Sequence, residues 1–222
     1  MSHYIKRVTF STLAFATGFT AFARVWPENS KELNTRRITE QKAEILESIK
    51  KSPNYIQLLR NEDYTGDVHS SRIPRLHQSN HVSQGLLFGP QHLEIDPLVF
   101  TNEKDKELQA YYHLGERLTS YDGNIHNGVI STILDELLCF CGFPELPSKR
   151  GVTAKLSIDF NQHVQPNTTV LLKAKVKEVK GRKVIIGGHI ETLDPNPIII
   201  ANANCVLVEP KWFKYFKWAS LF

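Results

Sequence analysis

Apolar and polar residues alternate along most of the second half of the chain, which is the pattern of half-buried β-strands. In residues 152–160 every second residue is apolar, from Val152 to Phe160, and the residues between them, such as Thr153, are polar. Similar patterns predict strands over residues 170–179, 184–192 and 198–208. The polar sequences Lys180-Gly181-Arg182 and Asp194-Pro195-Asn196-Pro197 predict the turns between them. We therefore expect four consecutive antiparallel strands.

One segment in the middle of the chain is apolar at helical rather than strand spacing. Residues 127–141 predict a helix with a broad apolar face made of Ile130, Ile133, Leu134, Leu137 and Cys141. Gly142 and Pro144 predict its end. Two further strand candidates, residues 86–100 and 107–118, precede it. Because so apolar a helix must be covered, this order favours the α+β class, with a long antiparallel sheet wrapped around one central helix.

The residues before the predicted sheet indicate a helical extension. Residues 27–60 carry apolar positions near helical spacing, interrupted at Ser52-Pro53-Asn54. Residues 61–84 are polar and show no periodicity, so we expect a linker or a loop draped over the domain. The basic residues of this segment are Arg72, Arg75 and His77. They are either solvated charges or the basic rim of a binding site for a phosphate-bearing ligand.

The N-terminal segment has the composition of a targeting or anchoring sequence. Residues 1–27 contain Lys6, Arg7 and Arg24 but no Asp or Glu, as in mitochondrial targeting sequences. The uncharged stretch from Val8 to Ala23 is close to a single membrane span, for which about 17–25 residues are usual. A secretory signal peptide fits less well, because Thr and Gly dilute its hydrophobicity. We expect a mitochondrial protein, with this segment either removed or retained as an N-terminal membrane anchor.

The C-terminal tail, residues 211–222, mixes aromatic residues with lysine. This composition suits an acidic membrane interface, and equally a segment that folds back over the domain. We therefore divide the chain into four parts: the targeting or anchor segment (1–27), the helical extension and linker (28–80), the sheet-and-helix domain (81–210) and the aromatic-basic tail (211–222).

The net charge and the cysteine content limit the kinds of ligand and partner that we expect. The formal net charge of +4 suits an anionic ligand or an acidic membrane, but it is too small to indicate nucleic acid. Cys139, Cys141 and Cys205 cannot pair evenly, and Cys-Phe-Cys lacks the two-residue spacer of a metal knuckle. We expect three reduced, mostly buried thiols, no metal site and no cofactor.

The central helix and the strands after it resemble a known superfamily. His126-Asn127-Gly128 and the residues up to Asp135 resemble the His-Gly-Gly…Asp signature of the 4-hydroxybenzoyl-CoA thioesterase-like hotdog superfamily. Residues 152–160 resemble the strand after its central helix, and residues 179–183 resemble its hairpin. The resemblance extends to mitochondrial long-chain acyl-CoA thioesterases.

This resemblance implies an acyl-CoA thioesterase that works as a homodimer with its site at the subunit interface. Asp135 would attack the thioester or activate water, with Glu136 as the alternative; periodicity alone would make Asp135 a solvated residue. Gly128 lies in the first helical turn, where unpaired backbone N–H groups favour an oxyanion. His126 would assist there or simply cap the helix. Thr153 would orient water or be structural.

The resemblance also implies CoA binding near the hairpin, where Lys180, Arg182 and Lys183 would meet phosphates; a solvated hairpin tip has the same composition. The chain departs from the signature at Asn127, where the family commonly has Gly. Asn tolerates unusual backbone angles, but its side chain could narrow the thioester slot. A second expectation is therefore an inactive hotdog domain that serves as a membrane-tethered binding or assembly factor.

Overall fold

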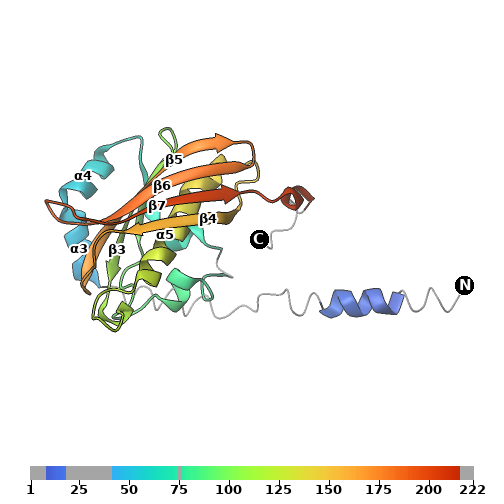
Figure 1. Cartoon of the computed structure of the whole chain (residues 1–222), viewed down its shortest axis with the longest axis horizontal. Coiled ribbons are helices and arrows are strands. Elements are labelled where there is room, and N and C mark those ends of the chain that lie inside the picture. Colours follow the sequence, from blue (N-terminus) through green and yellow to red (C-terminus); the bar gives the residue numbers. More distant parts are fainter. Residues whose placement is uncertain (1–8, 19–41, 75–76, 216–222) are drawn as a thin grey trace, which may run out of the picture.

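Seven strands form one antiparallel sheet in the order β1-β2-β3-β5-β6-β7-β4 (Figure 1). The structure is a computed structural model that describes residues 9–18, 42–74 and 77–215. The strands are β1 (Thr65–Val68), β2 (Leu98–Asn102), β3 (Glu107–Leu114), β4 (Val152–Phe160), β5 (Thr168–Lys180), β6 (Lys183–Thr192) and β7 (Ile199–Val208). The α-helices described from residue 42 onward are α3 (Ala43–Lys51), α4 (Pro53–Arg60) and α5 (Asn127–Gly142).

Helix α5 lies against one face of the sheet and contacts strands β3 to β7 (Figure 1). All five residues of the predicted apolar face are at most 5% exposed. The sheet therefore covers the helix, as its composition requires. This is the hotdog arrangement, and the predicted α+β fold is confirmed.

The opposite face of the sheet carries a second, smaller core. Tyr111 of β3 packs there with Ile49 of α3 and Leu58 of α4, whereas its neighbours Ala110 and Tyr112 belong to the core around α5. Strand β3 is consequently buried on both sides. Helices α3 and α4 thus cover the outer face of the sheet at β2, β3 and β5.

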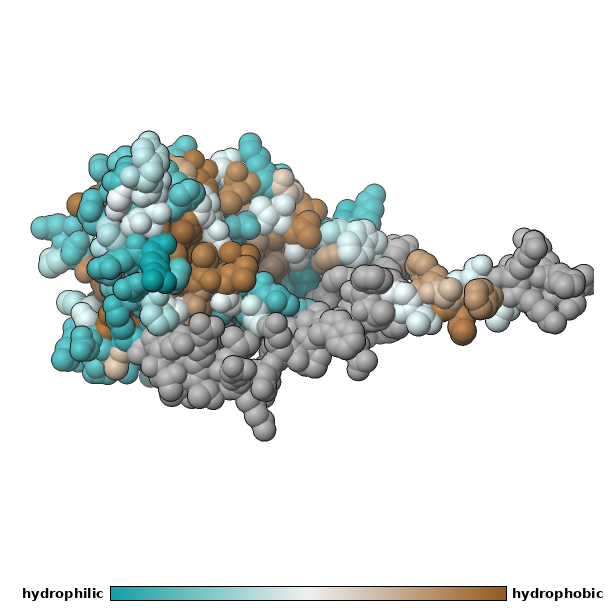
Figure 2. Space-filling view, turned by 90° about the horizontal axis from the view of Figure 1, so that it is seen from below, coloured by the Kyte–Doolittle hydropathy of each residue, from teal (hydrophilic) through white to brown (hydrophobic). Residues whose placement is uncertain are grey.

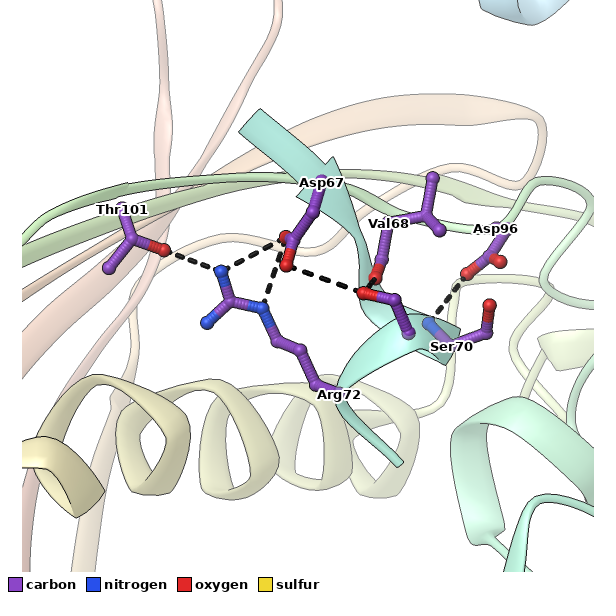
Figure 3. A network of polar contacts seen from close by, with 7 residues as sticks. Asp67, Val68, Ser70, Arg72, Asp96 and Thr101 are labelled. Carbon is purple, nitrogen blue, oxygen red and sulfur yellow. Dashed lines mark hydrogen bonds and ion pairs between the residues drawn. The ribbon is translucent and has the colours of Figure 1, made fainter. Parts of the chain in front are cut away.

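The expectation that residues 61–84 lack regular structure is wrong at residues 65–68, because β1 pairs antiparallel with β2. Figure 3 shows how this strand is fixed: Arg72 donates hydrogen bonds from Nε and Nη2 to Asp67 Oδ1, at 3.1 and 3.0 Å, and from Nη2 to Thr101 Oγ1 at 2.5 Å. Nearby, the Ser70 N–H donates to Asp96 Oδ1 at 3.1 Å. Arg72 is thus ion-paired rather than a free cation.

Two other predicted elements are shorter than expected. The extension contains two helices, and the predicted break at Ser52 is where one ends and the next begins; its hydroxyl caps α4 by accepting from Tyr55 N–H at 3.3 Å. The strand expected over residues 86–100 begins only at Leu98, just after Pro97, whose ring removes a ladder donor. The hairpin is confirmed: Lys180 pairs with Lys183 across a two-residue turn in which Gly181 has φ +57°.

Part of the N-terminal segment is described. Residues 9–18 are helical, and hydrophobic residues are visible on the surface of this helix in Figure 2. Phe10, Leu13 and Phe15 are exposed. In the described part of the chain, no helix combines the length and hydrophobicity that crossing a membrane requires. The rest of the predicted span lies outside the described residues, as do Arg75 and residues 216–222 of the tail. Residues 211–215 form a short 3-10 turn with Trp212 exposed.

Candidate active site

The helix that carries the signature begins at Asn127, and His126 is its N-cap. His126 Nδ1 accepts a hydrogen bond from Gly128 N–H at 2.8 Å, replacing the partner that first-turn amides lack. A Cβ at position 128 would lie 2.8 Å from the same nitrogen, so glycine permits this close approach. The N–H of Asn127 has no hydrogen-bond partner among the described residues. It is therefore the amide that stays available at this helix end.

Asp135 lies two helical turns further along α5 and faces β4. The Thr153 hydroxyl donates to Asp135 Oδ1 at 2.8 Å. The side chain is half-buried, and its second oxygen, Oδ2, has no hydrogen-bond partner in the described part of the chain. One carboxylate oxygen is thus anchored, and the other is available for chemistry.

A β-bulge brings Thr153 to this position. Plain alternation along β4 would put Thr153 on the opposite face from Leu156. The register with β7 shifts between Thr153 and Lys155, so that Thr153 pairs with Leu207 and Leu156 pairs with Cys205. Both β7 partners are fully buried against α5. The extra residue therefore turns Thr153 toward the helix.

Two thiols lie next to Asp135 and Thr153. Cys139, one turn beyond Asp135, has its Sγ 3.1 Å from Thr153 Oγ1. The carboxylate of Asp135 and the sulfurs of Cys139 and Cys205 all lie within 4.8 Å of one another. A hydrogen bond to Cys205 and burial raise the pKa of Cys139, and the same hydrogen bond lowers the pKa of Cys205.

Glu136 faces a different environment, on the side of α5 covered by residues 81–86. Ser83 donates to its carboxyl group from both the hydroxyl and the backbone N–H, and His81 Nδ1 lies 3.5 Å from Oε1. Burial raises the pKa of Glu136 to about 7, and the nearby Asp135 charge adds to the rise. The alternative catalytic carboxylate is therefore mostly covered, with 14% of its side chain exposed, and both its oxygens accept hydrogen bonds from Ser83.

The structure separates the two ends of the predicted site. Gly128 and Asp135 are seven residues apart on one straight helix, which corresponds to about 10 Å. A thioester carbonyl cannot contact the amide at one end and the carboxylate at the other within one subunit. Asp135 and Thr153 are brought together, whereas His126, Asn127 and Gly128 form a separate group.

The predicted CoA-binding hairpin lies at the same end of the sheet as Thr153. Thr153 pairs with Leu207, Leu207 with Val184, and Val184 with Val179, which precedes the hairpin. The hairpin is thus two strand spacings from Thr153, about 10 Å.

The three basic residues of the hairpin are exposed but differ in their partners. Lys180 pairs with Glu178, and Arg182 Nη1 donates to the Glu209 carbonyl at 2.7 Å. Lys183 has no ion-pair or hydrogen-bond partner through its side chain among the described residues. It is the hairpin cation with most freedom to meet an anion.

Sequence reasoning gave neither Cys139 nor Cys205 a role in the site. The helical spacing of Asp135 and Cys139, four residues apart, was a usable signal that these two side chains share a face. No local signal places Cys205 beside them, because this contact depends on the register between β7 and α5. The prediction of three reduced, buried thiols is confirmed.

Comparison with known proteins gives the family. The model of the thioesterase superfamily matches residues 122–199. A protein of Candida albicans described as "Uncharacterized protein, mitochondrial" is 49% identical over the whole length of both chains. A Saccharomyces cerevisiae protein, "MIOREX complex component 3", is 42% identical over 98% of this chain and 95% of its own. The chain belongs to the thioesterase superfamily, in one family with these two fungal proteins.

A more distant relative carries a named activity. The rat "Acyl-coenzyme A thioesterase THEM4" is 28% identical over 98 residues, which is 43% of this chain and 40% of the rat protein.

Proposed function

We propose that the protein is a mitochondrial acyl-CoA thioesterase, which hydrolyses an acyl-CoA to the free acid and CoA. The observation that carries this proposal is Asp135, held through Oδ1 by the Thr153 hydroxyl with Oδ2 left free. Superfamily membership and the likeness to a rat acyl-CoA thioesterase support it. The description of the Candida relative as mitochondrial, together with the acid-free N-terminus, supports the location.

The proposed enzyme is a homodimer whose sites combine residues of both subunits. Two features support this. Strand β4 is at the edge of the sheet, with Val152 46% and Phe160 42% exposed, and such an edge invites pairing with another strand. The separation between Gly128 and Asp135 along α5 also requires a second copy to supply the oxyanion donor.

In the proposed reaction, Asp135 Oδ2 takes a proton from water while the water oxygen attacks the thioester carbonyl carbon. The amide of Asn127 from the second subunit stabilises the oxyanion, with the Gly128 amide available once the His126 ring turns away. The carbon–sulfur bond then breaks, and the CoA sulfur receives the proton from Asp135. Direct attack by Asp135, followed by hydrolysis of the mixed anhydride, would use the same groups.

Substrate binding is proposed at the hairpin. Lys183, with Lys180 and Arg182 beside it, would meet CoA phosphates as charged donors. The pantetheine arm would then cross β6 and β7 toward Thr153. The role of Asn127 as a wall of the thioester slot is part of the same proposal.

The test is hydrolysis of acyl-CoAs of varied chain length by the full chain, followed through release of the CoA thiol. We expect activity that falls about 1,000-fold in Asp135→Asn, because the variant lacks the proton acceptor. Glu136→Gln is the matched control one residue away and should retain activity. Full activity of Asp135→Asn would contradict the assignment of the site.

A second function has its own supporting observation. The Saccharomyces relative is named as a component of a complex, which supports a role for this chain as an assembly or binding factor. The membrane tether of this second candidate rests on the composition of the N-terminal segment. The capped Gly128 amide and the residue Asn127 favour this candidate. It would replace the enzyme proposal if the correctly folded dimer hydrolysed no acyl-CoA of any length while co-purifying with a stable set of mitochondrial proteins.

A further inference from the structure

Three metal-ligating side chains converge at the junction of α5 and β7. Asp135 and Cys139 are four residues apart on the helix and so project from the same face. Cys205 reaches them from β7, where its partner across the ladder is Leu156. The oxygen and the two sulfurs lie within 4.8 Å of one another, although the residues come from segments 66 positions apart.

This spacing is close to that of a bound zinc ion. Zn²⁺ takes sulfur ligands at about 2.3 Å and carboxylate oxygens at about 2.0–2.2 Å in a tetrahedron, which places neighbouring ligand atoms about 3.5–4 Å apart. Movements of about 1 Å or less would therefore bring the three atoms into coordination. Two thiolates and one carboxylate form a ligand set that selects a borderline-soft divalent ion over Mg²⁺ or Ca²⁺.

The environment also favours an ion. Both thiols are buried and neither is in a disulfide. Thr153 Oγ1 lies 2.8 Å from Asp135 Oδ1 and 3.1 Å from Cys139 Sγ, so this hydroxyl has to move aside when an ion enters. The half-buried Asp135 provides the route for entry, because Cys205 itself is fully buried.

We propose that Asp135, Cys139 and Cys205 form a Zn²⁺ site, with water in the fourth position. Two thiol protons leave on binding, and the ion neutralises most of the resulting negative charge. Thr153 gives up its hydrogen bond to Asp135 when the carboxylate binds the metal. The proposal does not depend on thioesterase activity. If the protein is a thioesterase, bound Zn²⁺ occupies its carboxylate and blocks hydrolysis.

Cobalt is the probe, because Co²⁺ takes the same ligands as Zn²⁺ and thiolate ligation gives it a charge-transfer absorption band. The reduced full chain is titrated with Co²⁺ without oxygen. We expect one equivalent to produce the band and Zn²⁺ to abolish it by displacement. Cys139→Ser and Cys205→Ser should each lose the thiolate band of the wild-type site, and Asp135→Asn should keep the band with affinity lowered about tenfold.

Cys141→Ser is the matched control. This thiol is equally buried on the same helix but lies 3.5 Å from the Lys106 carbonyl, away from the cluster. The variant should bind Co²⁺ as the wild type does. Absence of the band in the folded wild type, or an unchanged band in Cys139→Ser or Cys205→Ser, would overturn the proposal.

A second measurement avoids dependence on the folding of variants. The native wild-type chain is treated with a thiol-alkylating reagent with and without Zn²⁺, and the modified cysteines are identified by mass spectrometry. Zn²⁺ should slow alkylation of Cys139 and Cys205 at least tenfold and leave that of Cys141 unchanged. Equal rates at Cys139 and Cys205 with and without the ion would exclude the site.

Discussion

Asp135 and Glu136 are neighbours on α5, but the fold gives them opposite surroundings. Asp135 faces β4, is half-buried, and has one oxygen held by Thr153 and the other free. Glu136 faces residues 81–86, is hydrogen-bonded by Ser83 through both oxygens, and has a pKa raised to about 7. A step of one residue turns a side chain about 100° around the helix, which is enough to move it from one environment to the other.

The two residues differ in two properties that are both used to recognise a functional carboxylate: a shifted pKa and an oxygen atom left free of hydrogen bonds. A strongly shifted pKa in a protein frequently marks a catalytic group, yet buried structural acids show the same shift. By that criterion alone Glu136 would be selected. The carboxylate oxygen that has no hydrogen-bond partner among the described residues favours Asp135 instead, as proposed above. The geometry therefore carries more weight here than the perturbed titration.

The largest effect that would test this comparison is the contribution of Glu136 to the free energy of unfolding as the pH changes. Its pKa is raised in the folded state from 4.5 to about 7, so folding binds a proton; this contribution is present below pH 4.5 and is lost as the pH rises through 7. Glu136→Gln needs no proton and should be more stable than the wild type at pH 8 by up to about 3 kcal/mol. Urea unfolding at pH 4.5 and 8 measures this difference. Equal stability of the two proteins at pH 8 would show that the carboxylate is solvated.

The next effect concerns the support of Asp135. Thr153→Val removes the hydrogen bond to Oδ1 without changing the side-chain volume much, and should lower kcat about tenfold or more. Thr153→Ser keeps the hydroxyl and should stay near the wild-type rate. Single-turnover hydrolysis of one acyl-CoA compares the three proteins. If Val and Ser variants were equally active, Thr153 would have only a structural role.

A smaller effect is expected at the other end of α5. His126→Ala removes the side chain that caps Gly128 and should lower the free energy of unfolding by about 1 kcal/mol. His126→Asn restores a capping acceptor and should recover most of this loss. Denaturant unfolding at neutral pH distinguishes them. If the alanine variant were as stable as the wild type, the imidazole would not serve as the cap.

The smallest effect is expected at the hairpin. Lys183→Ala should raise KM for an acyl-CoA about threefold and leave kcat unchanged, because an exposed phosphate contact contributes about 0.5–1 kcal/mol. The control is Lys51→Ala, an exposed lysine in α3 at the opposite end of the domain (Figure 1). Steady-state kinetics at low and high salt should show a salt-dependent difference for Lys183 only. An unchanged KM would remove the hairpin from the binding site.

Several features of the fold followed from periodicity along the chain. The buried face of α5, the hairpin at Gly181 and the strands β5, β6 and β7 were all predicted, because each depends on residues close in sequence. The short strand β1 was missed, because its residues are mostly exposed and its pairing with β2 is its main structural signal. Alternation also placed Thr153 on the outer face of β4, and only the bulge reverses this.

The sequence by itself thus determined the hotdog order of elements and put His126, Gly128 and Asp135 on one helix. The resemblance also put Thr153 in the site with Asp135. Only the tertiary structure decided how Thr153 reaches it, through a shifted register, and that Cys205 joins them through the packing of β7 on α5. The physical reason is that periodicity is set by each residue's own neighbours along the chain. Contacts across the sheet depend instead on register, and one extra residue changes every side chain that follows.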